Sequence, residues 1–160
     1  MRSIEFISIH CSDYAPVHTI REVDSWHRKR NFLMVGYHFF VNNVDRGYLE
    51  LGRPLTMPSA AIAKFNRGQI AICVAGTTDF HPNQLQILYN LCRLLLDVFP
   101  HLTVNDIWGH AEFLEALGIE TDKTCPNMDM DIIRYNIEQT RKENHVYNPG
   151  DLLLLNGRGK

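Results

Sequence analysis

The chain has 160 residues, of which 45% are hydrophobic and 21% are charged, and its formal net charge is −2. This length fits one domain with a proper core, and the composition is that of an ordinary globular protein. A net charge so near zero gives no general affinity for polyanions, so we expect no nucleic-acid partner for the main function. No apolar run approaches the roughly 20 residues that span a membrane, so we also expect no membrane insertion.

The N-terminus and the cysteines indicate where the protein is made. Residues 1–13 hold too short an apolar run for a signal peptide, and no small-residue cleavage site follows it. We therefore expect a chain that is cytoplasmic as synthesised and that acts on other compartments only after release or delivery. Its cysteines, Cys11, Cys73, Cys92 and Cys125, are expected to be free thiols, with room for one metal ligand among them, rather than a disulfide framework.

The first third of the chain predicts a strand followed by a helix. Residues 4–12 are rich in isoleucine and partly alternate, which is typical of a strand. Residues 18–30 predict a helix, because Thr19 and Glu22 have the spacing of a capping box. The same helix would place Trp26 and His27 on its buried face, together with Ile20 and Val23.

The middle of the chain predicts three further strands. Residues 35–43 and 47–53 flank a turn at Asp45-Arg46-Gly47, which indicates a β-hairpin. Residues 69–76 form a short, almost continuous apolar run, as expected for a strand buried on both faces.

Two helices and one more strand are expected in the remainder. Pro82 opens a helix that Pro100 stops, with a predicted buried stripe of Leu85, Leu88, Cys92, Leu95 and Phe99. Residues 105–113 predict a strand that runs into a loop. Asp129 can then cap a last helix that carries Met130, Ile133 and Ile137.

Strands and helices alternate, but a hairpin interrupts the alternation. The sequence therefore predicts a single α/β domain with a central mixed β-sheet flanked by helices. We place this domain at residues 1–143. Residues 144–160 are expected to form a C-terminal tail that packs on the same domain or frays from it.

Three side chains form a candidate metal site. His10 ends the first predicted strand, His110 ends the fifth, and Cys125 lies in the turn that follows. Two imidazoles and one thiolate are a ligand set for catalytic zinc, with the fourth position left to water. Each residue alone also has a simpler reading, as a hydrogen-bonded histidine or a free surface thiol, and spacing along the chain does not show that they meet in space.

Six segments occur in an order that resembles a known family. They are IHCS, WHRKRNFLMVGYHFFVNN, FNRGQIAICVAGT, FHPNQL, WGHAEF and KTCPNMD, and the resemblance around them runs from about residue 4 to residue 135. The chain resembles the zinc-dependent N-acetylmuramoyl-L-alanine amidases of the phage lysozyme and peptidoglycan recognition protein type. The most specific parts are W-H-x-x-R before G-Y-H-F, and K-x-C-P downstream of G-H.

The resemblance implies roles for particular residues. His10, His110 and Cys125 match the family's zinc ligands, Tyr37 matches the tyrosine over the metal, and Lys123 matches the lysine near the substrate carbonyl. The implied reaction is hydrolysis of the amide that joins N-acetylmuramic acid to L-alanine in bacterial peptidoglycan. Zn²⁺ would activate the attacking water, with Lys123 stabilising the oxyanion and Tyr37 donating a hydrogen bond or shuttling a proton.

Other positions are less sharply defined by the resemblance. Asn66 matches a position near the cleft, where substrate contact and a turn-stabilising role are both consistent with the sequence. Glu112 is either a solvated loop carboxylate or a candidate for the proton donor to the leaving amine, and His38 is expected to pack or to support the site from behind. Ala61 stands where many relatives carry a histidine, and His81 stands where relatives often carry a threonine cap, which predicts a weaker helix start.

Two other functions remain open from the sequence. A non-catalytic module that binds peptidoglycan or muropeptides would share the fold, although such relatives typically lack the cysteine ligand. A structural zinc domain would need four protein ligands rather than three. The oligomeric state and the biological setting, whether phage lysin, recycling enzyme or delivered toxin, do not follow from these residues.

Overall fold

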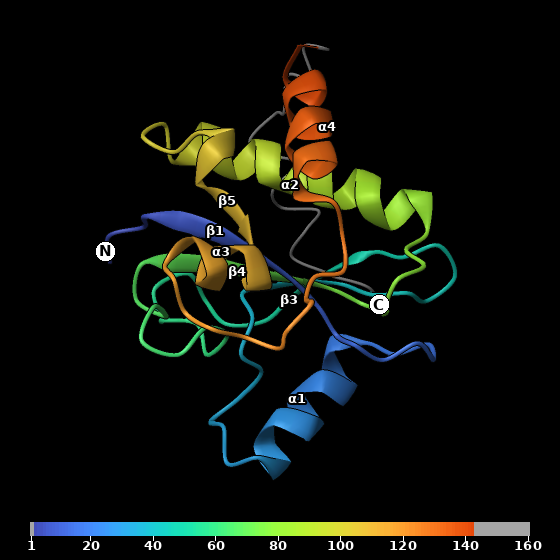
Figure 1. Cartoon of the computed structure of the whole chain (residues 1–160). Coiled ribbons are helices and arrows are strands. Elements are labelled where there is room, and N and C mark those ends of the chain that lie inside the picture. The colour runs from blue at the N-terminus through green and yellow to red at the C-terminus, as the bar shows by residue number, and fades with distance from the viewer. Residues whose placement is uncertain (1, 143–160) are drawn as a thin grey trace.

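The computed structural model describes residues 2–142, which form one mixed five-stranded sheet covered by helices (Figure 1). The strand order is β3-β2-β4-β1-β5, and only β3 runs antiparallel to its neighbour. The elements in chain order are β1 (Phe6–Cys11), α1 (Ile20–Lys29), β2 (Phe39–Val41), β3 (Leu49–Leu51), β4 (Gln69–Val74), α2 (Pro82–Val98), the 3₁₀ turn η1 (Val104–Asp106), β5 (Ile107–Gly109), α3 (His110–Ala116) and α4 (Met130–Lys142). The predicted fold class is confirmed. The predicted tail lies outside the described residues.

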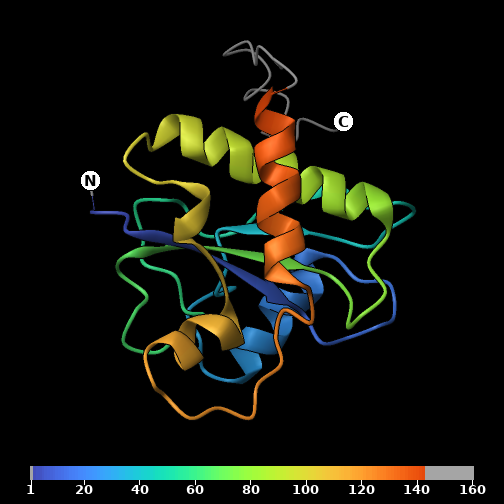
Figure 2. The same ribbon diagram turned by 45° about the horizontal axis from the view of Figure 1, so that its top comes forward.

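One face of the sheet is purely apolar. Side chains alternate along a strand, so Ile7 and Ile9 of β1 point to the same side as Ile70 and Ile72 of β4. These residues pack with buried leucines of α2 and with Met130, Ile133 and Ile137 of α4. Figures 1 and 2 show α2 and α4 crossing each other on this side, with α1 on the opposite side. This layer is the main core of the protein.

The opposite face of the sheet carries polar groups. Ser8 and His10 alternate with the isoleucines of β1, and His10 pairs with Cys73 of β4 in the strand register. A smaller apolar cluster, formed by Val23, Val35, Phe40, Cys73 and Ala75, covers part of this face beneath α1. His10 therefore lies on the polar-bearing face, near the carboxyl end of a central parallel strand.

The structure corrects the prediction for residues 105–113. This segment is not one strand running into a loop: only Ile107–Gly109 is a strand, and His110 is the first residue of α3. Glu112 explains the difference, because its Oε2 accepts a hydrogen bond from the Gly109 N–H at 3.0 Å and so satisfies a backbone donor at the helix start.

The α2 helix (Pro82–Val98) begins at Pro82 as predicted, but it buries a partly different set of side chains. His81 accepts a hydrogen bond from the Asn83 N–H at 3.1 Å through Nδ1, so its side chain caps the helix. The buried stripe is Gln84, Leu88, Leu91, Cys92, Leu95 and Leu96. Leu85 and Phe99, predicted to be in the stripe, are only partly buried at its edge.

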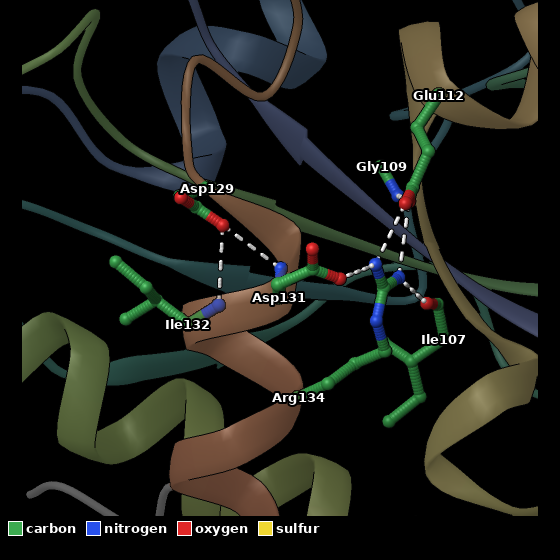
Figure 3. Close-up of polar contacts among 7 residues, drawn as sticks. All are labelled: Ile107, Gly109, Glu112, Asp129, Asp131, Ile132 and Arg134. Atoms are coloured by element: carbon green, nitrogen blue, oxygen red, sulfur yellow. Dashed lines mark hydrogen bonds and ion pairs between the residues drawn. The ribbon is translucent and has the colours of Figure 1, made fainter.

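The start of α4 is fixed by Asp129, as predicted. Its Oδ1 accepts hydrogen bonds from the N–H groups of Asp131 at 3.0 Å and Ile132 at 3.2 Å (Figure 3). These backbone donors have no partner within the helix, so the carboxylate both satisfies them and complements the positive end of the helix dipole. The cap thereby fixes where the loop that carries Cys125 joins the helix.

One turn later, Arg134 ties α4 to β5 and α3. Its guanidinium lies 2.7 Å from Glu112 Oε1 and 2.8 Å from Asp131 Oδ1, and it donates to the Ile107 carbonyl at 2.9 Å (Figure 3). Glu112 is therefore held by an arginine and a backbone N–H at once. No helix within residues 2–142 is both long and apolar enough to cross a membrane.

Replacing the cap should destabilise the fold measurably. We expect Asp129→Ala to lower the free energy of unfolding by about 1 kcal/mol, because two helix N–H groups lose their acceptor. Asp131→Ala, which removes a carboxylate that is 93% exposed, is the matched control and should cost less. Chemical denaturation of both variants tests this, and equal losses would contradict the assignment of the cap.

Candidate active site

The structure brings the three predicted metal ligands together. His10 comes from the end of β1, His110 from the first residue of α3, and Cys125 from the loop before α4. One ligand atom from each lies within 4.8 Å of the other two, and His10 Nδ1 is 3.9 Å from Cys125 Sγ. The two imidazole rings meet edge to face, with centroids 4.8 Å apart. Within residues 2–142, this is the only group of three such side chains with that geometry.

Both imidazoles are held in the neutral form that binds a metal. Burial, followed by the electrostatic influence of His110 and Lys123, keeps the pKa of His10 well below its ordinary value. Burial and Lys123 lower the pKa of His110 to about 4. A histidine ligand must be unprotonated on the nitrogen that faces the ion, and these shifts remove the competing proton at neutral pH.

Backbone hydrogen bonds hold Cys125 against the two histidines. The N–H of Cys11 donates to Cys125 Sγ at 3.3 Å, and the N–H of Ala111 donates to the Cys125 carbonyl at 2.8 Å. The Ala111 N–H belongs to the first turn of α3 and has no partner inside the helix. The adjacent Cys11 thiol and burial raise the pKa of the Cys125 thiol, so a cation beside the sulfur is what favours its thiolate.

A close backbone approach fixes the distance between the two loops. A Cβ at Gly109 would lie 2.8 Å from Pro126 Cδ and 3.0 Å from Met130 Cγ. Only glycine therefore allows the residue before His110 to touch the residue after Cys125. Asn127 ties the Cys125 loop to a third segment, the loop after β4, because its Nδ2 donates to the Thr77 carbonyl at 2.9 Å.

The donor set fits zinc better than a hard cation. Two imidazole nitrogens and one thiolate are ligands that Zn²⁺ commonly takes, whereas Mg²⁺ and Ca²⁺ prefer oxygen. Three protein ligands also leave coordination positions for water and substrate. The chemistry of the side chains, together with their neutral imidazoles, is therefore that of a catalytic rather than a structural metal site.

Tyr37 and Lys123 border the same cleft as the three ligands. The cleft has a volume of about 520 Å³, and the Tyr37 ring centroid is 5.3 Å from that of His10. Burial raises the pKa of Tyr37 well above its ordinary value, so the phenol keeps its proton. Lys123 is exposed at the rim, and its charge is close enough to lower the pKa of both histidines.

An apolar groove of about 460 Å³ adjoins the cleft. Ala61, Phe65, Asn66 and Leu114 are among its lining residues, while His110 and Lys123 line both spaces. Asn66 Oδ1 accepts from the N–H groups of Ala61 at 2.9 Å and Ile62 at 3.1 Å. The structure thus shows a turn-stabilising role for Asn66. A contact with substrate would have to come from its Nδ2.

Three other candidate residues have structural partners. Glu112 is engaged by Arg134 and the Gly109 N–H, so it is neither a free proton donor nor a solvated loop carboxylate. His38 accepts from the Ala71 N–H at 3.0 Å and lies 2.9 Å from the Met57 carbonyl, as expected for a packing residue. His27 is buried as predicted, although it also lines the cleft, whereas Trp26 is only partly buried.

Sequence reasoning missed two kinds of residue. Gly109 has a signal in hindsight, because it directly precedes a predicted ligand. Ser8 lies two residues before His10 and so on the same face of β1, where its Oγ is 2.9 Å from His10 Nε2. Gln69 has no such signal, because it reaches Ser8 only through the pairing of β1 with β4.

Comparison with known families shows which family the chain belongs to. The sequence profile of the N-acetylmuramoyl-L-alanine amidase family matches residues 1–128. The chain belongs to this family. It is therefore a peptidoglycan amidase, which hydrolyses the amide between N-acetylmuramic acid and L-alanine.

Individual relatives of the amidase agree with this assignment. The endolysin of Enterobacteria phage T3 is 29% identical over 136 residues, covering 79% of this chain and 82% of that protein. The endolysin of Escherichia phage T7 is 28% identical over 138 residues, covering 80% and 83%. Both alignments extend over most of each protein.

Solved structures share the fold of the amidase. The N-acetylmuramoyl-L-alanine amidase LysC from Clostridium intestinale matches with a TM-score of 0.71 and 21% identity, covering 86% of this chain and 87% of that chain. The ectodomain complex of peptidoglycan recognition proteins LCa and LCx, bound to tracheal cytotoxin, matches with a TM-score of 0.67 and 21% identity, covering 84% and 82%.

Filling the contact at Gly109 should disturb the metal site. We expect Gly109→Ala to lower the free energy of unfolding by about 1–3 kcal/mol and to weaken metal binding, because the added methyl group pushes Pro126, and with it Cys125, away from His110. Gly68→Ala is the control, since its methyl group would meet only the flexible end of Glu5. Metal titration of both variants tests the prediction, and unchanged affinity in Gly109→Ala would refute it.

Proposed function

We propose that the amidase is zinc-dependent and that His10, His110 and Cys125 hold the ion. The observation that carries this proposal is the convergence of two neutral imidazoles and one cysteine within 4.8 Å, beside an accessible cleft. When bound there, zinc would supply a Lewis acid for the substrate carbonyl and lower the pKa of water from 15.7 to about 7. The remaining chemistry belongs to the side chains around the cleft.

Lys123 and Tyr37 are proposed as the catalytic side chains. Lys123 brings a positive charge to the rim of the cleft, where it can stabilise negative charge that develops on the carbonyl oxygen. Tyr37 keeps its proton because of burial, so it acts as a hydrogen-bond donor rather than as a base. Glu112 plays no part in proton transfer, because Arg134 and a backbone N–H occupy its carboxylate.

The substrate is proposed to span the cleft and the adjoining groove. His110 and Lys123 line both spaces, so a bound chain with its scissile amide at the metal would continue between Ala61 and Leu114. Asn66 Nδ2 is a donor at the edge of this groove and is proposed to contact the substrate. A muropeptide is a suitable ligand, and one structural neighbour is bound to tracheal cytotoxin.

The biological role is proposed to be that of an endolysin. The phage T3 and T7 relatives carry that name and align over more than four fifths of their own length. We infer that the protein acts on the bacterial wall after it has been released from the cell interior or delivered to the wall.

Removing the sulfur ligand tests the metal assignment. We expect Cys125→Ser to lose zinc and to stop releasing stem peptide from purified peptidoglycan, with the fold retained. Cys92→Ala, which changes a buried cysteine in the α2 core, should keep both zinc and activity at some cost in stability. Elemental analysis and an assay of newly formed amines give the two readouts.

Either of two results would count against the proposal. Full activity after chelation or in Cys125→Ser would exclude the zinc mechanism. Zinc-loaded protein that binds muropeptides but releases no amine would instead make this chain a binding module.

Removing the charge at the cleft rim tests the role of Lys123. We expect Lys123→Ala to lower kcat by about 10²–10³-fold with a much smaller change in KM, because the charge acts on the transition state. Lys29→Ala, on the exposed end of α1, is the control and should leave both constants unchanged. A raised KM with unchanged kcat would make Lys123 a substrate-docking residue.

A further inference from the structure

We propose that a buried chain of hydrogen bonds from Asn66 to His10 fixes the His10 proton on Nε2 and so leaves Nδ1 free to bind the metal. The inference rests on the proposed zinc site for its functional meaning. Its physical content, the tautomer of one buried imidazole, is independent of whether zinc binds. Ser8, Gln69 and Asn66 would then be positioning residues that act through His10.

The chain of hydrogen bonds has three links, all on the polar-bearing face of the sheet. Gln69 Nε2 donates to Asn66 Oδ1 at 3.1 Å, and the Ser8 hydroxyl donates to Gln69 Oε1. Ser8 Oγ then lies 2.9 Å from His10 Nε2. Ser8 and Gln69 are fully buried and His10 is 2% exposed, so water does not replace either hydrogen bond of Ser8, whereas Asn66 at the start of the chain is partly buried.

Which group donates and which accepts along these hydrogen bonds is determined at the Asn66 end. The peptide N–H groups of Ala61 and Ile62 both point at one side-chain atom of Asn66, and a peptide N–H can only donate. That atom must therefore be the carbonyl oxygen. An oxygen there requires Gln69 to present its NH₂ group, which turns the Gln69 oxygen towards Ser8.

The number of hydrogens on each group also determines which nitrogen of His10 carries the ring proton. A serine hydroxyl has one hydrogen, and Ser8 gives it to Gln69 Oε1. Ser8 Oγ can then only accept from His10, so Nε2 carries the hydrogen and Nδ1 carries the lone pair. Nδ1 is the nitrogen that faces Cys125, with its Sγ 3.9 Å away. The two loop N–H groups thus determine, over three hydrogen bonds, which nitrogen is presented to the metal.

This arrangement has a functional consequence beyond the orientation of one ring. A histidine ligand with a hydrogen-bond acceptor behind it is held in one tautomer and one ring orientation, and loss of such a partner typically costs 10–100-fold in metal affinity. Here the partner chain begins at the 59–66 loop, whose residues line the apolar groove. The wall of the groove and the metal site therefore share one hydrogen-bond system.

The test measures the tautomer and the metal affinity separately. Long-range ¹H–¹⁵N correlation spectra of metal-free, ¹⁵N-histidine-labelled protein distinguish a protonated from an unprotonated ring nitrogen. Competition with a chromophoric chelator gives the affinity for zinc. In the unaltered protein we expect His10 to be protonated on Nε2 alone.

Two variants interrupt the chain of hydrogen bonds at different links. Gln69→Met removes the acceptor for the Ser8 hydroxyl, which then donates to His10 Nε2, so the Nδ1-protonated tautomer should appear and zinc affinity should fall about 10–100-fold. Ser8→Ala removes the partner of Nε2 altogether, and a mixture of tautomers with a similar loss of affinity is expected. Using both variants protects the test against one of them failing to fold.

Two controls separate positioning from general packing. Ser59→Ala removes a buried hydroxyl that also donates to Asn66 Oδ1, at 3.0 Å, but lies off the chain to His10. Asn66→Asp keeps an accepting oxygen at the start of the chain. Both should retain the Nε2 tautomer and bind zinc within about twofold of the unaltered protein, unlike Gln69→Met, whose loss is at least tenfold.

The possible outcomes have distinct meanings. A His10 ring protonated on Nδ1 in the unaltered protein, or a tautomer and an affinity unchanged in folded Gln69→Met and Ser8→Ala, would overturn the proposal. A tautomer that shifts as described in a protein with no affinity for zinc would leave the hydrogen-bond chain standing and refute the zinc assignment instead.

Discussion

The structure of the site depends on one constraint, which is that the imidazole of His10 is buried near the end of a central strand and both of its nitrogens need partners. Unpaired polar atoms in a dry interior are costly. One nitrogen is satisfied from inside the sheet by Ser8, and the other is directed at the place where His110 and Cys125 converge. The remaining loops and helix ends hold these two residues in position.

One face of the sheet forms the main core, and the other face carries side chains of the candidate site. The isoleucines of β1 and β4, packed against α2 and α4, form the apolar face and the main core. The opposite face carries Ser8, His10 and Gln69 and leaves room for a cleft. Because neighbouring residues of a strand point to opposite sides, a single six-residue strand contributes to both functions.

Much of the fold could be predicted from periodicity, turn residues and caps. Thr19, Asp129 and the hairpin turn were readable because each acts on its own neighbours in the chain. His110 was misplaced at a strand end, because the helix start depends on Glu112 bonding back to Gly109 and on Cys125, fifteen residues away, accepting from Ala111. The first of these contacts is local, but the second exists only in the folded chain.

The candidate site was predictable to a different extent. Its three ligands were singled out by their predicted places at strand ends and in a turn, and a resemblance in their motifs then matched them to zinc ligands, since no pattern of spacing shows that residues 10, 110 and 125 meet. Asn66 was left with two roles, because only the structure shows that its oxygen is used by the loop and its nitrogen faces another way. Gln69 looked like one polar residue at the start of an apolar run. Its significance comes from strand pairing and from the direction of hydrogen bonds, which a linear sequence does not carry.

The shared wall between the cleft and the groove has a practical consequence. Five residues, His110 and Lys123 among them, line both spaces, so the candidate metal ligands border directly on the apolar surface around Phe65 and Leu114. A small inhibitor that joins a metal-chelating group to an apolar substituent would occupy the cleft and the groove at once. The substituent would add apolar contacts with groove residues such as Phe65 and Leu114 to the chelating contact.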